Sequence, residues 1–194
     1  GFRGEALPSI ASVSHLVLTT RGEGDSAGTE VEVRHGQPVH VRDAGHPRGT
    51  TVEVRDLFGA VPARRKFLRA DSTEAGHVGE AVTLLALGRP QTGFTLLSGG
   101  RSLLGAPPVS DLAARLYQIF GGSVLDALVP VDGGDPACRV TGFVSRPDRR
   151  GPSRPSLRLF VNRRAVRDRA LAKAVAQGYR GAGGAERPYE AFLF

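Results

Sequence analysis

Alternating apolar and polar positions in the first part of the chain predict a set of β-strands. Residues 16–20 are apolar and β-branched, which is typical of a strand. Residues 29–34 and 39–42 each alternate, with Gly36 between them, and predict a hairpin with one solvated face. Residues 50–55 alternate again. We therefore expect an antiparallel sheet in this part of the chain.

Helical segments are predicted on either side of these strands. Residues 5–14 indicate a short helix, in which Glu5 lies at the positive end of the helix dipole. Pro62 is a suitable first residue for a short basic helix. Ser72 is a suitable N-cap for a longer helix to about Leu87, which Gly88 ends.

The second half repeats the mixture of helix and strand. Residues 94–104 predict a hairpin with a glycine turn, and the stiff residues 105–108 mark a domain boundary. Ser110 and Asp111 then cap a helix that ends at Phe120. The remaining expected elements are strands at 127–131, 139–144, 157–161 and 191–194, and a helix from Val166 or Arg167 to about Tyr179.

Charge is unevenly distributed along the chain, whose net charge is +7. Residues 145–180 contain eleven Arg or Lys and two Asp, so this segment carries +9 and the rest carries −2. A basic block on a nearly neutral body favours a polyanionic partner such as nucleic acid. The alternative is that arginine is merely abundant, with 24 Arg against 2 Lys, and forms a solvated face.

Composition excludes several other classes of protein. One cysteine excludes an internal disulfide, and the five histidines lack the spacing of metal ligands. Cys138 lies in an alternating segment and is expected to be a buried structural thiol. The longest apolar run, 82–87, is too short to span a membrane. With 40% hydrophobic residues, the chain can form a real core.

The opening segment 1–7 combines two glycines with an arginine directly before a predicted helix. Glycines allow a backbone to approach a ligand closely, and a helix start offers unpaired N–H groups to an anion. The pattern is compatible with a phosphate cradle to which Arg3 adds charge, although an ordinary loop would look the same. The chain contains no methionine, so we expect it to be a fragment of a longer protein.

Three ordered segments together resemble the signatures of the MutL family of DNA mismatch-repair proteins. They cover nearly the whole chain, which makes the resemblance specific. The segments are Gly1–Leu7 followed by Ser9–Val13, then Gly49–Phe58 with Pro62–Leu68, and finally Phe160–Arg164 with Val166–Arg169.

This resemblance implies an α+β fold built of two-layer α/β sandwiches. Residues 1–106 would form the C-terminal portion of a GHKL (Bergerat) ATPase domain. Residues 107–194 would form a transducer domain similar to domain 2 of ribosomal protein S5. The alternative within the same architecture is another GHKL ATPase, such as a type II topoisomerase subunit.

The resemblance also implies a set of nucleotide contacts. The opening loop would belong to a lid over ATP, and Thr50 would lie at the adenine pocket, whereas Thr51 is read as a strand residue. The phosphate contacts would come from the backbone of Gly1, Phe2, Arg3 and Gly4. ATP and Mg²⁺ are the implied cofactors. The catalytic glutamate, the asparagine that holds Mg²⁺ and the Asp-x-Gly segment would all precede Gly1, and a phosphate-binding lysine would follow Phe194.

For DNA, the resemblance points to the basic motif of the second half. The expected backbone contacts are Arg163, Arg164, Arg167, Arg169 and Lys173, of which Arg169 has the best-matching place. Arg169 and Lys173 are four apart and share a helical face. Asp168 is expected to be a capping or ion-pair partner. The run 64–66 is interpreted as a solvated or packing face.

The implied function is DNA mismatch repair by an ATP-switched, DNA-binding matchmaker. Such a protein couples a mismatch-recognition protein to a downstream nuclease or helicase and forms a homodimer on binding ATP. It is expected to act in the cytoplasm at the nucleoid, with no membrane partner. The fragment alone is expected to hydrolyse no ATP. A non-enzymatic nucleic-acid-binding domain that uses only the basic half is the remaining alternative.

Overall fold

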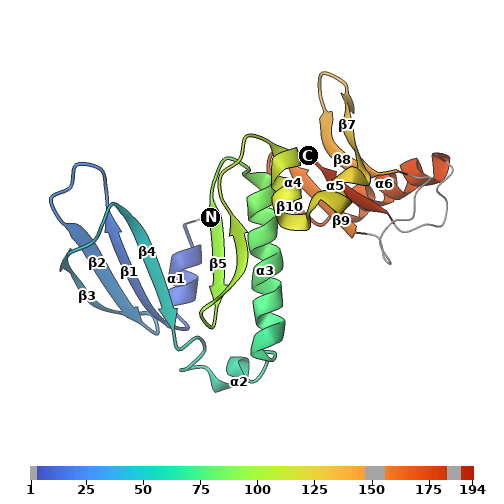
Figure 1. The fold of residues 1–194 in the computed structure, drawn as a ribbon. Coiled ribbons are helices and arrows are strands. Elements are labelled where there is room, and N and C mark those ends of the chain that lie inside the picture. Colours follow the sequence, from blue (N-terminus) through green and yellow to red (C-terminus); the bar gives the residue numbers. More distant parts are fainter. Residues whose placement is uncertain (1–3, 147–155, 183–188) are drawn as a thin grey trace. The chain divides into compact units, whose positions relative to one another are not determined.

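The computed structural model describes residues 4–146, 156–182 and 189–194. The chain forms two compact units, Gly1–Ala70 and Asp71–Phe194, which are considered separately below. Helices and strands alternate through both units (Figure 1). Within the described residues, no helix is both long enough and apolar enough to cross a membrane.

The first unit is a four-stranded antiparallel sheet with a short helix on one face. The strand order is β3-β2-β1-β4, so the strands predicted from alternation are confirmed. Its elements are α1 (Ala6–Ala11), β1 (His15–Arg21), β2 (Gly28–Arg34), β3 (Gln37–Ala44), β4 (Gly49–Arg55) and α2 (Pro62–Arg65).

The two faces of this sheet differ in chemistry because side chains alternate along each strand. Leu16 lies opposite both Val33 and Val54, and this apolar face packs on α1. The other face is polar. There, Glu30 accepts hydrogen bonds from His40 at 3.0 Å and from Arg42 at 2.9 Å, which hold the pKa of Glu30 below its usual range.

The second unit combines a five-stranded sheet, a two-stranded hairpin and four helices. The strand orders are β10-β9-β11-β8-β7 and β5-β6, and among the strands in the described ranges only β9 and β11 pair in parallel. The helices are α3 (Asp71–Gly88), α4 (Leu112–Phe120), α5 (Gly122–Asp126) and α6 (Arg169–Gly181). The strands are β5 (Phe94–Ser98), β6 (Arg101–Ala106), β7 (Leu128–Gly134), β8 (Arg139–Ser145), β9 (Ser156–Val161), β10 (Arg164–Val166) and β11 (Glu190–Leu193).

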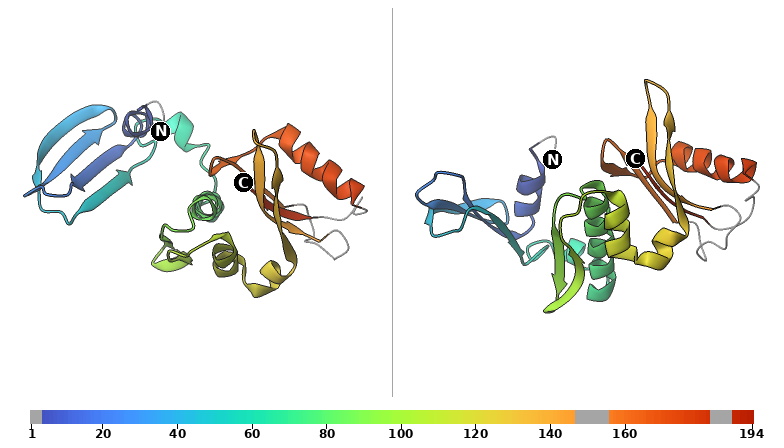
Figure 2. Two further views of the ribbon diagram at one scale, coloured as in Figure 1. Left: turned by 90° about the horizontal axis from the view of Figure 1, so that it is seen from above. Right: turned by 45° about the horizontal axis from the view of Figure 1, so that its top comes forward.

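Helices cover both faces of the five-stranded sheet. Figures 1 and 2 show α6 on the face opposite α4 and α5. The core on the α4 side consists of Leu87, Leu116, Leu128, Phe160 and Phe192. On the α6 side the buried positions include Leu159, Ala191 and Tyr179 of the helix itself. Both faces of the five-stranded sheet are therefore buried under apolar side chains of helices.

A two-residue turn joins β9 to β10 and corrects the expected helix start. Val161 pairs with Arg164, and the turn residues Asn162 and Arg163 have φ of 50° and 64°. Val166 thus ends a strand, and α6 begins only at Arg169. Two positive φ values are the signature of a type I′ hairpin turn, which favours Asn-Gly. Arginine in the second place costs about 1 kcal/mol, because its Cβ crowds the backbone there.

Two other features differ from what the sequence predicts. Cys138 is exposed in the turn before β8 rather than buried. Helix α5 was not expected, because Gly121-Gly122 reads as a stop; Gly121, at φ 83°, does end α4, but a new helix begins at Gly122. The boundary between the two compact units lies between residues 70 and 71 in the sequence, because α3 packs on α4 and β10. The domain boundary at 106 and 107 that the family resemblance implies is a different division of the chain, and it stays a prediction.

Candidate functional site

The expected ATP lid is described only at its last residue. Gly1, Phe2 and Arg3 lie outside the described residues. Gly4 is exposed and has φ of 67°, a backbone conformation that glycine adopts without strain. A Cβ built on Gly4 would meet no atom within 4 Å, so the positive φ and not crowding is what favours glycine there.

Thr50 lies at the start of β4, directly opposite Thr20 of β1. The Thr20 hydroxyl donates to the carbonyl oxygen of Gly49 at 3.3 Å, and its oxygen lies 2.8 Å from that of Thr50. Either hydroxyl can be the donor between the two. The exposed Thr50 oxygen keeps acceptor capacity, which suits a ligand group that donates a hydrogen bond.

Thr51 has a different partner from Thr50, as expected for its opposite direction on the strand. Its hydroxyl lies 2.8 Å from Nε2 of His46. Nδ1 of His46 donates to the carbonyl oxygen of Pro47 at 2.6 Å. No motif marks the roles of Thr20 and His46, although the register of two alternating strands places Thr20 opposite Thr50.

The basic segment of the second unit separates into interior and surface arginines. Arg158 is interior, with Nη1 3.3 Å from a Glu190 carboxylate oxygen and its guanidinium 4.9 Å from the Phe120 ring centre. By contrast, the side chains of Arg169, Lys173 and Arg180 are exposed on α6. The spacings of four and eleven residues place these three on one helical face. We call them the α6 basic stripe.

Asp168 fixes the start of the helix that carries this stripe. Its carboxylate accepts a hydrogen bond from the backbone N–H of Leu171 at 2.9 Å, which confirms the expected cap. The first turn contains no acidic residue and instead begins with Arg169. A cation at the positive end of a helix is electrostatically unfavourable by itself and is favoured only when an anion binds there.

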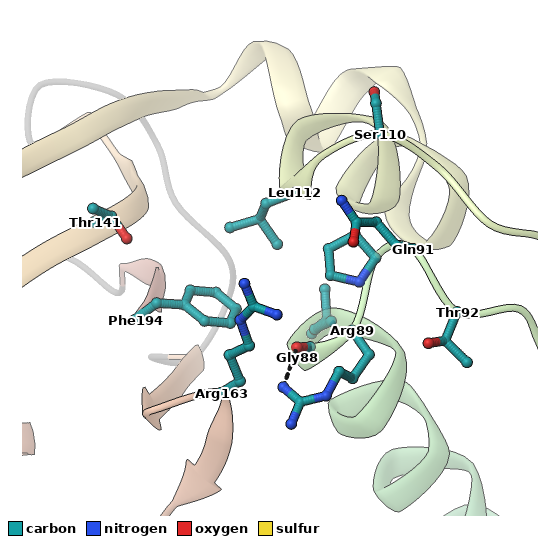
Figure 3. A pocket seen from close by; sticks show the side chains of 11 residues that line it. Gly88, Arg89, Gln91, Thr92, Ser110, Leu112, Thr141, Arg163 and Phe194 are labelled. Carbon is teal, nitrogen blue, oxygen red and sulfur yellow. Dashed lines mark hydrogen bonds between the residues drawn. The ribbon is translucent and has the colours of Figure 1, made fainter.

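The other three expected DNA contacts precede α6 and do not belong to its stripe. Arg164 is exposed in β10, and Arg167 is exposed directly before the Asp168 cap. Arg163 occupies the strained turn and lines a cavity of about 320 Å³ together with Arg89 (Figure 3). The five arginine and lysine positions grouped by sequence are therefore distributed over a turn, a strand, a connection and a helix.

The loop 89–92 that forms one wall of this cavity is held by a buried arginine. Arg115 of α4 is fully buried, and its Nη2 donates to the carbonyl oxygens of Pro90 at 2.5 Å and Thr92 at 2.7 Å. Neither Arg89 nor Arg115 was singled out by sequence. Arg115 directly precedes Leu116 of the apolar stripe of α4. Nothing in the neighbouring sequence indicates that distant carbonyl groups would accept its protons.

A metal site is not formed by the described part of the chain. No group of three or more His, Cys, Asp or Glu side chains gathers there in a way that could hold a metal ion.

Comparisons with known proteins identify the family of the chain. Residues 116–194 match the family described as DNA mismatch repair protein, C-terminal domain. The fold is similar to that of the Aquifex aeolicus MutL ATPase domain complexed with ADP, with a TM-score of 0.78 and 31% identity. That match covers 99% of this chain and 71% of the Aquifex chain. The chain belongs to the MutL family of DNA mismatch repair proteins.

Curated MutL proteins resemble the chain over most of its length. MutL of Anaeromyxobacter sp. (strain K) is 54% identical over 181 residues, and MutL of Geobacter sulfurreducens is 44% identical over 180 residues. Each match covers 93% of this chain and 30% of the curated protein. The chain thus spans about a third of the length of these MutL relatives.

A similarity to a topoisomerase subunit is limited to the fold. The B-subunit of DNA gyrase from Myxococcus xanthus has a TM-score of 0.57 and 17% identity over 95% of this chain. The likeness shows a shared fold and nothing further. Sequence identity places the chain with MutL rather than with gyrase.

Proposed function

We propose that the intact protein is an ATP-hydrolysing, DNA-binding matchmaker of DNA mismatch repair. The observation that carries this proposal is the match to a MutL ATPase domain that was solved with ADP. Within this chain, Gly4 would end the lid over the phosphates, and the Thr50 oxygen would accept a hydrogen bond from the adenine amino group or from a bridging water. ATP would be the nucleotide, and Mg²⁺ would be held by residues outside the described part.

DNA would bind to the second unit. The α6 basic stripe offers three exposed cations, and the helix start behind the Asp168 cap adds backbone N–H groups. Arg163, Arg164 and Arg167 would extend the cationic surface. Contacts of this kind neutralise phosphates and position the duplex without reading base sequence.

The intact protein would dimerise on binding ATP and couple a mismatch-recognition protein to a nuclease or helicase, in the cytoplasm at the nucleoid. The direct test is steady-state ATP turnover by the intact protein, together with its sedimentation with and without a non-hydrolysable ATP analogue. Hydrolysis and nucleotide-dependent dimerisation support the proposal. Absence of both would favour a non-enzymatic nucleic-acid-binding protein instead.

The 194-residue chain by itself is proposed to hydrolyse no ATP, since the expected general base is not among its assigned residues. Phosphate release by this chain that depends on Mg²⁺ and survives Arg3→Ala would overturn that part. A supercoiling assay on the intact protein distinguishes the mismatch-repair function from the topoisomerase alternative, which is supported by fold similarity alone. We expect no ATP-dependent supercoiling.

A further inference from the structure

The cavity beside the β9–β10 turn brings Arg163, one of the proposed DNA contacts, together with Arg89, which has no proposed role. It lies wholly within the second unit, between the end of α3, the start of α4 and the β9–β10 turn (Figure 3). Arg163 and Arg89 line it from different walls, and Ser110 and Thr92 add hydroxyl groups. Leu112, Phe194 and other apolar side chains complete the lining.

Among the described residues, none of those that line this cavity is acidic. The nearest carboxylate that bonds to the lining is Asp111, which accepts the proton of Ser110 at 2.8 Å. Arg89 donates to the carbonyl oxygen of Gly88 at 3.1 Å, and across the described ranges neither Arg89 nor Arg163 pairs with a carboxylate. The buried Arg115 behind the wall likewise bonds only to neutral oxygens, and its Nε has no partner in this part of the structure.

The backbone at Arg163 indicates that its side chain is placed there at a cost. Its φ of 64° is one that glycine adopts freely and arginine does not. The turn is also held closely against α3, because a Cβ on Gly88 would come within 2.7 Å of the Arg163 carbonyl oxygen. A strained residue held by its surroundings is often one that serves function.

We propose that this cavity binds a phosphate ester, with the guanidinium groups of Arg163 and Arg89 on the phosphate oxygens. Guanidinium groups form paired hydrogen bonds to phosphate, and two of them with a buried third match a doubly charged anion. The apolar wall formed by Leu112 and Phe194 accepts the group esterified to the phosphate.

This site is separate from the nucleotide contacts of the first unit and from the α6 basic stripe. Two sources supply the same chemistry: a phosphorylated small molecule, or a backbone phosphate of bound DNA. The proposal does not rest on the mismatch-repair function. Substitution of the α6 basic stripe would weaken DNA binding but would leave phosphate binding in this cavity unchanged. Failure of the DNA-binding proposal is therefore distinguishable from failure of the phosphate-site proposal.

Arginine labelling in the intact protein tests the site residue by residue. Phenylglyoxal modification is mapped by mass spectrometry with inorganic phosphate, with acetate at equal ionic strength, and with duplex DNA that has no terminal phosphates. At a phosphate concentration ten times its Kd, labelling of Arg163 and Arg89 should slow roughly tenfold. Arg101, exposed on β6 outside the cavity, should be unaffected and is the internal control.

The DNA arm distinguishes the two sources of the phosphate. Protection of both arginines by duplex DNA assigns the site to backbone phosphate, and protection by inorganic phosphate alone assigns it to a small ester. The proposal is overturned if phosphate protects neither residue, if acetate protects equally, or if both residues are unreactive even without phosphate.

Variants provide an independent measurement. Arg163→Gly relieves the strained turn, so its thermal midpoint should rise by roughly 2–4 °C while the midpoint increase caused by phosphate is reduced. Arg89→Gln should lose the same phosphate effect without the gain in stability, and Arg101→Gln should retain the phosphate effect. A phosphate effect that is unchanged in both Arg163→Gly and Arg89→Gln would contradict the proposal.

Discussion

The Tyr179 hydroxyl donates a hydrogen bond to the carbonyl oxygen of Ser145 at 2.9 Å and thereby ties α6 to β8. The Ser145 side chain completes the link, since its oxygen accepts from the backbone N–H of Glu190 at 3.0 Å and lies 3.1 Å from the Tyr179 oxygen. The helix with the basic stripe is thus anchored to the sheet near the helix end.

Removal of this hydroxyl by Tyr179→Phe should destabilise the protein by about 1–2 kcal/mol, because a buried carbonyl loses its partner. Denaturant unfolding of the intact protein, followed by near-ultraviolet circular dichroism, measures the loss. Tyr117→Phe, at an exposed position of α4, is the matched control and should be neutral. Equal stabilities of Tyr179→Phe and wild type would show that the link contributes nothing.

The cap at Asp168 makes separable predictions for stability and for DNA binding. Asp168→Ala should cost about 1 kcal/mol through the lost hydrogen bond to Leu171, whereas Asp168→Asn keeps a capping oxygen and most of the stability. Because Asp168→Asn removes a negative charge between Arg167 and Arg169, it should tighten DNA binding at low salt. Weaker binding by this variant would contradict the placement of DNA at the start of α6.

The nucleotide role of Thr50 is tested by a pair of neighbouring substitutions. Thr50→Val keeps the shape but removes the hydroxyl, and should weaken ATP binding by the intact protein roughly tenfold, the equivalent of one hydrogen bond. Thr51→Val should leave affinity unchanged, since that hydroxyl faces His46. Titration with a fluorescent ATP analogue measures both. Equal losses in the two variants would indicate a general disturbance of β4.

The polar face of the first unit predicts a pH dependence of stability. Hydrogen bonds from His40 and Arg42 lower the pKa of Glu30, so the folded state favours the carboxylate more than the unfolded chain does. This contribution is complete above the ordinary pKa of glutamate. It is lost as pH falls from there through the lowered pKa of the folded state.

Glu30→Gln should therefore lose less stability than wild type between about pH 6 and about pH 3, where the ordinary glutamate pKa near 4.3 is crossed. Denaturant midpoints at the two pH values give the comparison. Other carboxylates lower both curves, so the difference between the proteins is the quantity of interest. An identical loss of stability in wild type and Glu30→Gln would mean that the hydrogen bonds of Glu30 to His40 and Arg42 make no net contribution to stability.

Much of the fold could be predicted from sequence because its signals are local. The alternation in β1 to β4, the Asp111 and Asp168 caps, and the glycine turn between β5 and β6 all act within a few residues. Two elements are not predicted, the short helix α5 and the strand β10. Strand β10 is three residues long and follows a turn in which arginine occupies the place that glycine normally takes. That substitution hides the hairpin signal.

Candidate site residues could be named from the sequence only where a motif marks them. Thr50, Arg169 and Lys173 stand in recognisable segments, whereas the cavity joins Arg89 to Arg163 through packing of α3 on the β9–β10 turn. Arg115 is buried because two carbonyl groups over twenty residues away accept its protons. Contacts of that kind arise from tertiary structure and leave no periodic signal in the sequence.

The salt dependence of DNA binding by the α6 basic stripe tests the account most directly. Duplex affinity of the intact protein is measured against salt for wild type and for the double variant Arg169→Ala/Lys173→Ala. The charge-matched control is Arg64→Ala/Lys66→Ala, which alters the exposed basic residues at α2. If each stripe residue neutralises one phosphate, the slope of log affinity against log salt should become shallower by about 1.8 in the stripe variant alone. An unchanged slope in that variant, or an equal change in the control, would contradict the assignment of DNA to this helix.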